Sequence, residues 1–196
     1  MPLPALSSAQ TCRRPVRSAS KPGSPVAASG VQLAYDCRMA FSTTSLMTDM
    51  YELTMVDAAI ASGTAERKCV FEAFGRRLPG ERRYGVVCGT GRVLEAIRDF
   101  RFNPEEIEYL ASRAIVSDRT AEYLADYRFT GDVYGYAEGE CYFPHSPVLT
   151  VTGSFAECVV LETVILSILN HDSAVATAAS RMTAAAHGRP CLEFGA

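Results

Sequence analysis

The sequence predicts a mixed α/β fold, and two observations lead to this class. Short β-prone segments bounded by glycine, proline or other turn-forming residues are typical of strands, and they occupy residues 69–74, 84–88, 132–136 and 147–151. Segments with apolar residues at helical spacing or with helix-capping signals alternate with these strands, and they occupy residues 49–62, 90–100, 104 onward, 118–127 and 156–187. The 196 residues leave room for one domain with a real core, since a typical domain has roughly 100–150 residues.

Composition places the chain among soluble globular proteins and argues against several partners. Hydrophobic residues make up 48% and charged residues 21% of the chain, a balance typical of ordinary globular domains. The formal net charge of -3 gives no basic excess of the kind that nucleic-acid binders need. The most apolar stretch, residues 155–169, contains two glutamates and falls short of the ~20 apolar residues of a membrane span. We therefore expect neither nucleic acid nor a membrane as a partner.

The seven cysteines are scattered and odd in number, and no two of them form a C-x-x-C pair. This pattern favours neither a zinc site nor a disulfide framework, so we expect no metal bound by cysteine. Reduced thiols are the simpler interpretation, which predicts a cytoplasmic protein.

Residues 1–44 differ in kind from the rest of the chain. Proline, serine, alanine and arginine are frequent there without hydrophobic periodicity, which predicts a disordered leader. The leader carries basic residues and no acid before Asp36, a composition similar to that of an organelle transit peptide. A start codon set too far upstream and a natural flexible extension explain it equally well, so its origin stays open.

The first predicted helix spans about Asp49 to Ser62. Thr48 is the expected N-cap, acidic residues in the first turn suit the helix dipole, and Gly63 is the expected end. The apolar residues of this helix are spread around most of its circumference instead of forming one stripe. We therefore expect the helix to be packed between other elements or subunits.

A long helical stretch follows the last central strand. Residues 156–187 contain no glycine or proline, but the cluster at 170–173 (NHDS) favours capping over a helix interior. This predicts two helices, the second of them alanine-rich, capped by Asp172 or Ser173 and ended by Gly188. Cys191 to Phe194 reads as a final short strand, so the chain looks interrupted rather than complete.

Three local motifs suggest chemistry, each beside a simpler structural explanation. Residues 88–91 (CGTG) follow a strand and open a helix, so their backbone N–H groups could hold a phosphate, but a tight turn is favoured. Four arginines flank the turn at Pro79-Gly80 and could meet pyrophosphate or carboxylate groups, although a solvated hairpin tip is slightly favoured. His171 stands near serines and an aspartate, but neighbours on one helix do not generally form a catalytic triad.

Five dispersed motifs resemble those of the nicotinate phosphoribosyltransferase family. Residues 46–55 read LMTDMYELTM, similar to the family's opening motif L-x-T-D-x-Y-x-x-T-M. Residues 71–77 (FEAFGRR) and 84–89 (YGVVCG) are similar to the family's F-E-x-F-x-R-R and to its apolar run into glycine. Residues 138–163 resemble E-G-x-x-x-F-P-x-x-P-x-L-x-V-x-G followed by L-E-T, and residues 191–195 resemble the strand before the family's R-R-x-H stretch.

The resemblance implies a reaction: nicotinate and phosphoribosyl pyrophosphate give nicotinate mononucleotide and pyrophosphate, coupled to ATP hydrolysis with Mg²⁺, as the entry step of NAD salvage. It implies an α+β N-terminal domain over residues 45–155 and, over residues 156–196, the beginning of an irregular α/β barrel that is incomplete. It also implies a homodimer, in which the tyrosine matching Tyr51 stacks on the pyridine ring in the neighbouring subunit's site. Tyr51, Asp49 and Arg181 are therefore the candidate substrate-binding residues.

The resemblance also predicts what this chain does on its own. The family's R-R-x-H stretch, its phosphate-binding loops and its phosphorylated histidine all lie beyond the point that matches Ala196, so the catalytic residues are expected outside the chain. We expect a truncated chain that is inactive by itself and prone to aggregate, because an unclosed barrel leaves apolar faces uncovered. The alternatives are a non-catalytic dimerisation partner or remnant of the same family, a nicotinamide- or quinolinate-type transferase, and a nucleotide-binding module built on residues 89–91.

Overall fold

The computed structural model describes residues 44–194, and the predicted leader lies outside the described residues except for its last position. The described residues form a mixed α/β fold, which confirms the predicted class. In chain order the elements are η1 (Ser45–Met47), α1 (Met50–Ser62), β1 (Lys68–Phe74), β2 (Gly85–Val86), α2 (Thr90–Asp99), α3 (Pro104–Ser112), α4 (Asp118–Ala125), β3 (Asp132–Gly135), β4 (Cys141–Tyr142), β5 (Pro147–Ser154), α5 (Phe155–Val159) and α6 (Glu162–Ala186). The domain boundary proposed at 155/156 stays a prediction.

Two small antiparallel sheets supply the strands of the fold. The larger sheet has the order β1-β5-β3, with Phe71 and Val133 both opposite Val151 of the central strand. The smaller sheet pairs β2 with β4. Alternate residues of β1 are half-buried and exposed, the pattern expected of a strand with one face on a core.

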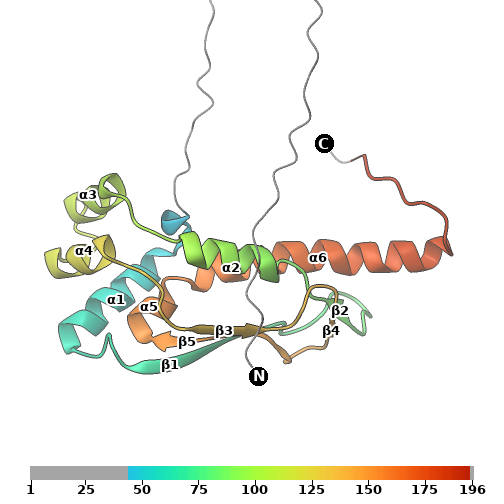
Figure 1. Ribbon diagram of the computed structural model, residues 1–196, viewed down its shortest axis with the longest axis horizontal. Coiled ribbons are helices and arrows are strands. Elements are labelled where there is room, and N and C mark those ends of the chain that lie inside the picture. Colours follow the sequence, from blue (N-terminus) through green and yellow to red (C-terminus); the bar gives the residue numbers. More distant parts are fainter. Residues whose placement is uncertain (1–43, 195–196) are drawn as a thin grey trace, which may run out of the picture. The chain divides into compact units, whose positions relative to one another are not determined.

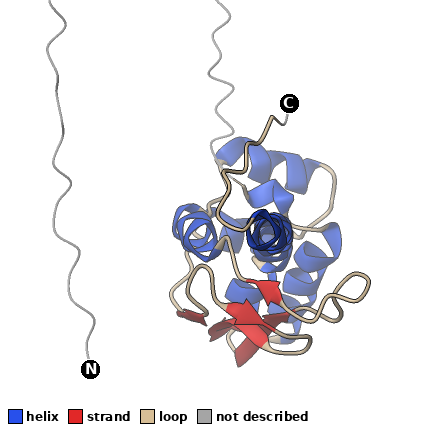
Figure 2. Cartoon of the chain, turned by 90° about the vertical axis from the view of Figure 1, so that its right-hand side faces the viewer, coloured by secondary structure: helices blue, strands red, loops and turns tan. Residues whose placement is uncertain are grey.

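The helices gather on one side of the larger sheet, as Figures 1 and 2 show from two directions. α5 packs on β5 and β1, α1 packs on α5 and α4, and α6 packs on β2 and α2. The most deeply buried side chains of the core come from every layer and include Val56, Val93, Phe100, Leu124, Leu149, Leu161 and Val164. The fold therefore has one contiguous core between the helical layer and the inner face of the sheet.

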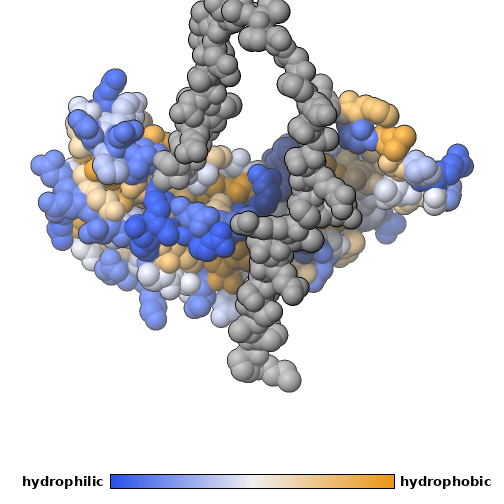
Figure 3. Space-filling view, turned by 45° about the horizontal axis from the view of Figure 1, so that its top comes forward, coloured by the Kyte–Doolittle hydropathy of each residue, from blue (hydrophilic) through white to orange (hydrophobic). Residues whose placement is uncertain are grey.

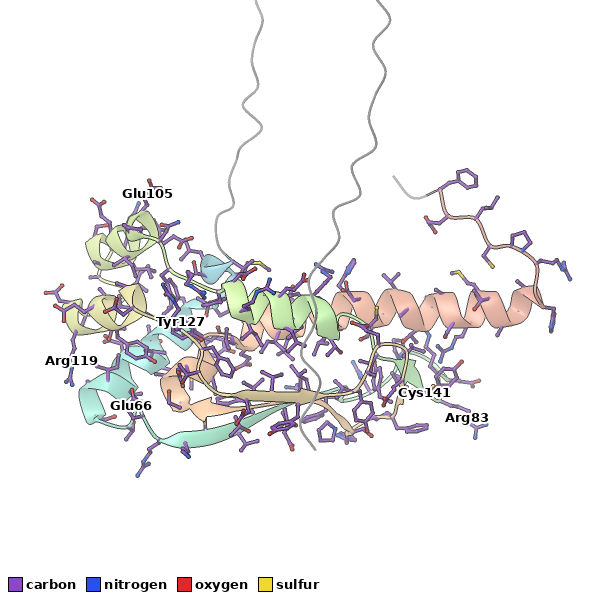
Figure 4. All side chains as sticks on the ribbon, viewed as in Figure 1. Glu66, Arg83, Glu105, Arg119, Tyr127 and Cys141 are labelled. Carbon is purple, nitrogen blue, oxygen red and sulfur yellow. The ribbon has the colours of Figure 1, made fainter. Side chains whose placement is uncertain are left out.

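Three rings fasten α3 and α4 to this core. Phe100, Phe102 and Tyr127 meet edge to face, with ring centroids 5.5 to 6.2 Å apart. The buried hydroxyl of Tyr127 donates to the Glu157 carbonyl oxygen at 2.7 Å, and Figure 4 places the labelled Tyr127 inside the fold beside α4. Edge-to-face packing of this kind adds about 0.5–1.5 kcal/mol per pair to ordinary burial.

The first helix begins one residue later than predicted. Asp49 is its N-cap, with extended backbone, and the predicted cap Thr48 is wrong. The Thr48 hydroxyl instead donates a hydrogen bond to the Glu52 carboxylate. At the other end Gly63 has a φ of 72°, which confirms it as the C-cap, because a left-handed residue there satisfies the last carbonyls with little strain in glycine.

The predicted break at residues 170–173 is wrong, because α6 runs without interruption from Glu162 to Ala186. Its polar residues do not cap a helix but bond a neighbouring segment: the Ser173 hydroxyl bonds the Cys88 N–H and carbonyl, each at 3.1 Å. The interruption lies instead at 160–161. There the Leu161 N–H bonds the Cys158 carbonyl at 3.2 Å, which tightens the turn between α5 and α6.

The predicted strand from Cys191 to Phe194 is also wrong. These residues follow the C-cap of α6 without regular structure, and Leu192 and Phe194 are 77% and 88% exposed. A strand needs a neighbour to accept its hydrogen bonds, and within the described residues none lies beside this tail. Towards the right-hand end of Figure 3, orange hydrophobic atoms are exposed beside blue and pale ones.

By length and composition, the run Phe155–Ala186 is one helical stretch that could cross a membrane, with a mean hydropathy of 1.4 over its most apolar window. However, 44% of that window is buried inside the fold. The core helix of a globular protein meets the same criterion, since such helices are apolar where they pack.

Candidate functional site

The N-termini of α1 and α6 meet, and this junction carries the predicted residue Tyr51. The Tyr51 hydroxyl donates to Glu162 Oε1 at 3.0 Å, joining two residues 111 positions apart in the sequence. The residue Tyr51 is 47% exposed. One edge of the ring is therefore fixed by Glu162, while a substantial part of it remains accessible.

Partial desolvation raises the pKa of Tyr51 to about 12, with further contributions from the hydrogen bond to Glu162 and from the nearby negative charges of Glu162, Glu52 and Asp49. The phenol therefore stays protonated at neutral pH. It acts as a donor to Glu162 and as an uncharged aromatic surface. A general base is the wrong role for such a group, because a base must give up its proton near the working pH.

Four apolar residues close to Tyr51 in the sequence are exposed. They are Leu46 and Met47 of η1 and Met50 and Met55 of α1, which are 40 to 65% exposed. The opposite side of α1 is buried and includes Leu53, Val56, Ala59 and Ile60. Among residues 44–194, then, only one side of α1 packs on other elements. The expected cover for its other side by a subunit or barrel stays a prediction.

A cavity of about 180 Å³ opens next to the junction, between the larger sheet and α6. Glu162 belongs to its lining together with Glu72, and the remaining lining residues are Phe71, Ala73, Leu149, Val151, Cys158, Ile165 and Leu166. Burial raises the pKa of the Cys158 thiol to about 12, so this cysteine is inert at neutral pH. The cavity is an apolar hollow with carboxylates at its edge.

The other two candidate residues lie in different places. Asp49 is the N-cap of α1, two residues from Tyr51. Arg181 lies 19 residues after Glu162 on α6, ~28 Å along the helix at 1.5 Å per residue. Its guanidinium lies 4.5 Å from the centre of the Tyr84 ring and donates to the Tyr84 carbonyl at 2.6 Å. One chain therefore brings Tyr51 and Asp49 together but leaves Arg181 far away.

The glycine motif at residues 88–91 is occupied by a side chain of the protein itself. Gly89 N–H and Gly91 N–H donate to the two carboxylate oxygens of Glu138 at 3.0 and 2.9 Å. The hydrogen bond from Gly91 is the main cause that lowers the pKa of Glu138. The arrangement satisfies the N-terminus of α2 internally, as expected of a structural turn.

The arginine-rich turn is not a hairpin tip, because β1 and β2, which flank it, belong to different sheets. Arg76, Arg77, Arg82 and Arg83 are all exposed, and Figure 4 shows Arg83 pointing away from the fold beside β2 and β4. The turn is an exposed connection with a high density of positive charge.

His171 does not form a triad with the serines near it. Its Nδ1 lies 2.9 Å from Asp172 Oδ1, and the same carboxylate accepts from Arg92 at 2.6 and 2.7 Å. The nearby Ser173 hydroxyl is instead committed to Cys88. The cluster ties α6 to α2 and presents no nucleophile.

The residue that the sequence arguments missed is Glu52. It is completely buried, and it accepts hydrogen bonds from both the N–H and the hydroxyl of Thr163, at 3.1 and 2.5 Å. The signal in the sequence was an acid placed in a helix that is otherwise rich in apolar residues. From the sequence alone, Glu52 was expected only to interact favourably with the dipole of its own helix.

A family model described as the nicotinate phosphoribosyltransferase (NAPRTase) N-terminal domain matches residues 46–170. The nicotinate phosphoribosyltransferase pncB1 of Mycobacterium tuberculosis is 59% identical over 150 residues, covering 76% of this chain and 33% of that protein. The nicotinate phosphoribosyltransferase of Bacillus subtilis is 34% identical over 151 residues, covering 77% and 31%. This chain thus spans about a third of the length of these relatives.

The fold has a solved counterpart as well. The crystal structure of human nicotinic acid phosphoribosyltransferase superposes with a TM-score of 0.69 at 29% sequence identity, covering 76% of this chain and 31% of the human one. The structural and sequence matches both cover about three quarters of the chain.

Proposed function

Since the chain belongs to the nicotinate phosphoribosyltransferase family, we propose that it supplies the N-terminal domain for transfer of phosphoribose from phosphoribosyl pyrophosphate to nicotinate. The product would be nicotinate mononucleotide, on the salvage route to NAD. The observation that carries the proposal is the Tyr51 ring, which is held by Glu162 and partly exposed at the junction of α1 and α6.

In this proposal Tyr51 is the flat wall against which the pyridine ring of nicotinate stacks. Stacking of a flat heterocycle on an aromatic ring is worth about 0.5–1.5 kcal/mol beyond its burial. The reaction displaces pyrophosphate at an anomeric carbon, so the protein's main tasks are to orient the ring and to stabilise the leaving phosphates. Tyr51 serves the first of these tasks.

The separation of Tyr51 and Arg181 supports a homodimer. Because one chain leaves these residues ~28 Å apart along α6, both can serve one site only if two subunits contribute. We propose that Tyr51 and Asp49 of one subunit complete the site of the other. The exposed apolar side of α1, with Met50 and Met55, is the surface that such a contact would cover.

We propose that the described residues do not by themselves hold the ATP and magnesium that the resemblance implies. Among residues 44–194 there is no group of three His, Cys, Asp or Glu side chains that could hold a metal ion. The backbone donors of Gly89 and Gly91 are taken by Glu138. The chemistry proposed for this chain therefore includes no step through either group. We further propose that the protein is cytoplasmic, as a salvage enzyme acting on soluble metabolites.

A chimaera tests the proposed function. Residues 46–170 of this chain would replace the matching segment of the Mycobacterium tuberculosis relative, to which the chain is 59% identical over 150 residues. We expect this chimaera to form nicotinate mononucleotide from nicotinate and phosphoribosyl pyrophosphate, measured by product chromatography against the unmodified relative. A folded, dimeric chimaera that forms no product would contradict the proposal.

The 196 residues alone are expected to give no turnover, because in this proposal they supply the pyridine wall without the groups that bind the pyrophosphate. The assay is the same, with purified chain, both substrates, ATP and Mg²⁺. Sustained product formation by the isolated chain would overturn this division of roles.

A further inference from the structure

The pair Tyr51–Glu162 has a second, buried pair directly behind it. Tyr51 and Glu52 are consecutive on α1, and Glu162 and Thr163 are consecutive on α6. Tyr51 bonds Glu162 at the surface, and Glu52 bonds Thr163 in the interior. The two helix N-termini are therefore joined twice, once at the surface and once in the interior.

Each carboxylate oxygen of Glu52 serves one of the two helices. Oε2 accepts from the Thr48 hydroxyl and from the Asp49 N–H, at the start of α1. Oε1 accepts from the N–H and hydroxyl of Thr163, at the start of α6. Two carboxylate oxygens offer about four acceptor positions, so these four donors use the full capacity of the side chain.

α6 needs such an acceptor because it has no cap of its own. Its N-cap residue is Leu161, whose side chain has no hydrogen-bond acceptor. In an uninterrupted helix the Thr163 N–H would bond the carbonyl four residues earlier, but here it bonds Glu52. The acid of α1 thus acts as the missing cap of α6 and fixes the point at which α6 begins.

We propose that Glu52 is a positioning residue: its buried carboxylate sets the register between the N-termini of α1 and α6, and thereby holds the Tyr51 ring against Glu162. Glu52 does not touch the ligand, because it is completely buried. The relevance of this role to nicotinate rests on the proposed function, but the role itself can be measured in the chain without any ligand.

The decisive substitutions are isosteric. In Glu52→Gln one oxygen becomes an NH₂ group, and whichever way the amide turns, one backbone N–H, that of Asp49 or that of Thr163, then faces another donor. Thr163→Val removes only the hydroxyl that bonds Oε1. Thr183→Val is the matched control, because the Thr183 hydroxyl bonds carbonyls of its own helix at 3.0 and 3.1 Å.

The readout is ¹⁹F NMR of the full chain labelled with 3-fluorotyrosine, with the Tyr51 signal assigned by its loss in Tyr51→Phe. We expect Glu52→Gln and Thr163→Val to move the Tyr51 signal and to lower its titration midpoint relative to that of the parent chain labelled in the same way. The other tyrosine signals should stay in place, as should all signals in Thr183→Val.

The inference is overturned if Thr163→Val and Glu52→Gln leave the Tyr51 signal and titration unchanged, or if Thr183→Val moves them as much. If Glu52→Gln does not fold, Thr163→Val alone tests the inference, because this variant keeps the buried Glu52 carboxylate and removes only one of its hydrogen bonds. A loss of activity in the chimaera described above would count against the proposed function, but not against this inference.

Discussion

At the scale of single residues, two neighbours on α1 have opposite environments. Tyr51 is about half exposed, whereas Glu52 is completely buried. A third polar residue of the same helix, Asp57, reaches α4 and accepts from the Ser117 N–H and hydroxyl at 2.9 and 2.6 Å and from Thr120 at 2.6 Å. Glu52 and Asp57 therefore each satisfy the N-terminus of another helix.

Removing the cap that Asp57 provides should destabilise the fold at neutral pH. We expect Asp57→Ala to lower the free energy of unfolding by about 1–2 kcal/mol, the usual cost of losing a side-chain cap. Urea denaturation at pH 7 measures it, with Glu122→Ala, an exposed acid within α4, as the control. Equal stabilities for the two variants would show that Asp57 does not act as a cap.

The sequence predicted which residue belongs to the candidate site, but it did not predict the long-range hydrogen bonds around that residue. The motif at residues 46–55 identified Tyr51 as the candidate site residue, and the structure places it at a junction of two helices. The sequence offered no means of locating Thr163, 111 positions from Glu52, as the partner of that acid. Local patterns show which residues are polar, but a hydrogen bond over such a distance depends on the assembled fold.

At the scale of elements, the most informative feature is a row of side chains on α6 that bond the backbone of residues 84–88, as a neighbouring strand would do. Ser173, Thr177 and Arg181 bond the backbone of Cys88, Val86 and Tyr84, respectively. Four residues of a helix rise ~6 Å and two residues of a strand rise ~6.6 Å. Because these two spacings are similar, every fourth residue of α6 can reach every second residue of the segment over three contacts. The helix thereby satisfies one edge of the segment at 84–88.

This row explains why the helix break was misplaced. The cluster at 170–173 is rich in capping residues, and local preference favours a helix end there. In the fold, Ser173 bonds Cys88 and Asp172 bonds Arg92. These tertiary bonds override the local preference. By contrast, α3 began where its proline and acids predicted, because Asn103 caps it within the same segment.

Truncating the row should weaken the docking of α6. We expect Ser173→Ala to cost about 1–3 kcal/mol, because the Cys88 N–H and carbonyl lose their partner in a buried place. Ser180→Ala should change stability by less than about 0.5 kcal/mol, since the Ser180 hydroxyl bonds only its own helix. Thermal unfolding of both variants provides the comparison, and a smaller loss for Ser173→Ala than for Ser180→Ala would refute the role of the row.

At the scale of the whole molecule, carboxylates hold the helix N-termini. Asp57 does so for α4, Glu138 for α2 and Glu52 for α6. Hydrogen bonds from Ser117 and Thr120 lower the pKa of Asp57, and those from Gly91 and Gly89, against some desolvation, lower the pKa of Glu138. A carboxylate whose folded pKa is lowered stabilises the fold above its unfolded pKa of ~4, and this contribution is lost as pH falls through the folded pKa.

The chain should therefore lose stability on acidification below about pH 4. The double variant Asp57→Asn, Glu138→Gln is expected to be less stable than the parent at pH 7 and to lose less between pH 6 and pH 3. Urea midpoints of both proteins across this range test the prediction. A double variant that loses as much stability as the parent would show that these two groups do not govern the acid response.

The global fold class could be predicted because alternating strands and helices follow from local periodicity. The layout of two separate sheets and the open side of α1 could not, since both depend on long-range pairing such as that of β1 with β5. The tail at 191–194 shows the same limit. Its residues have a strand-like pattern, but a strand forms only beside a partner, and within residues 44–194 the tail has none.

The central claim is that Tyr51 forms one wall of the nicotinate site, and the Michaelis constant for nicotinate in the chimaera tests it most directly. With Tyr51→Ala we predict a rise of about tenfold, equivalent to ~1.4 kcal/mol of lost stacking and burial. The Michaelis constant for phosphoribosyl pyrophosphate should change by less than about twofold, because the stacked ring contacts only the pyridine. A folded variant with an unchanged Michaelis constant for nicotinate would contradict the account.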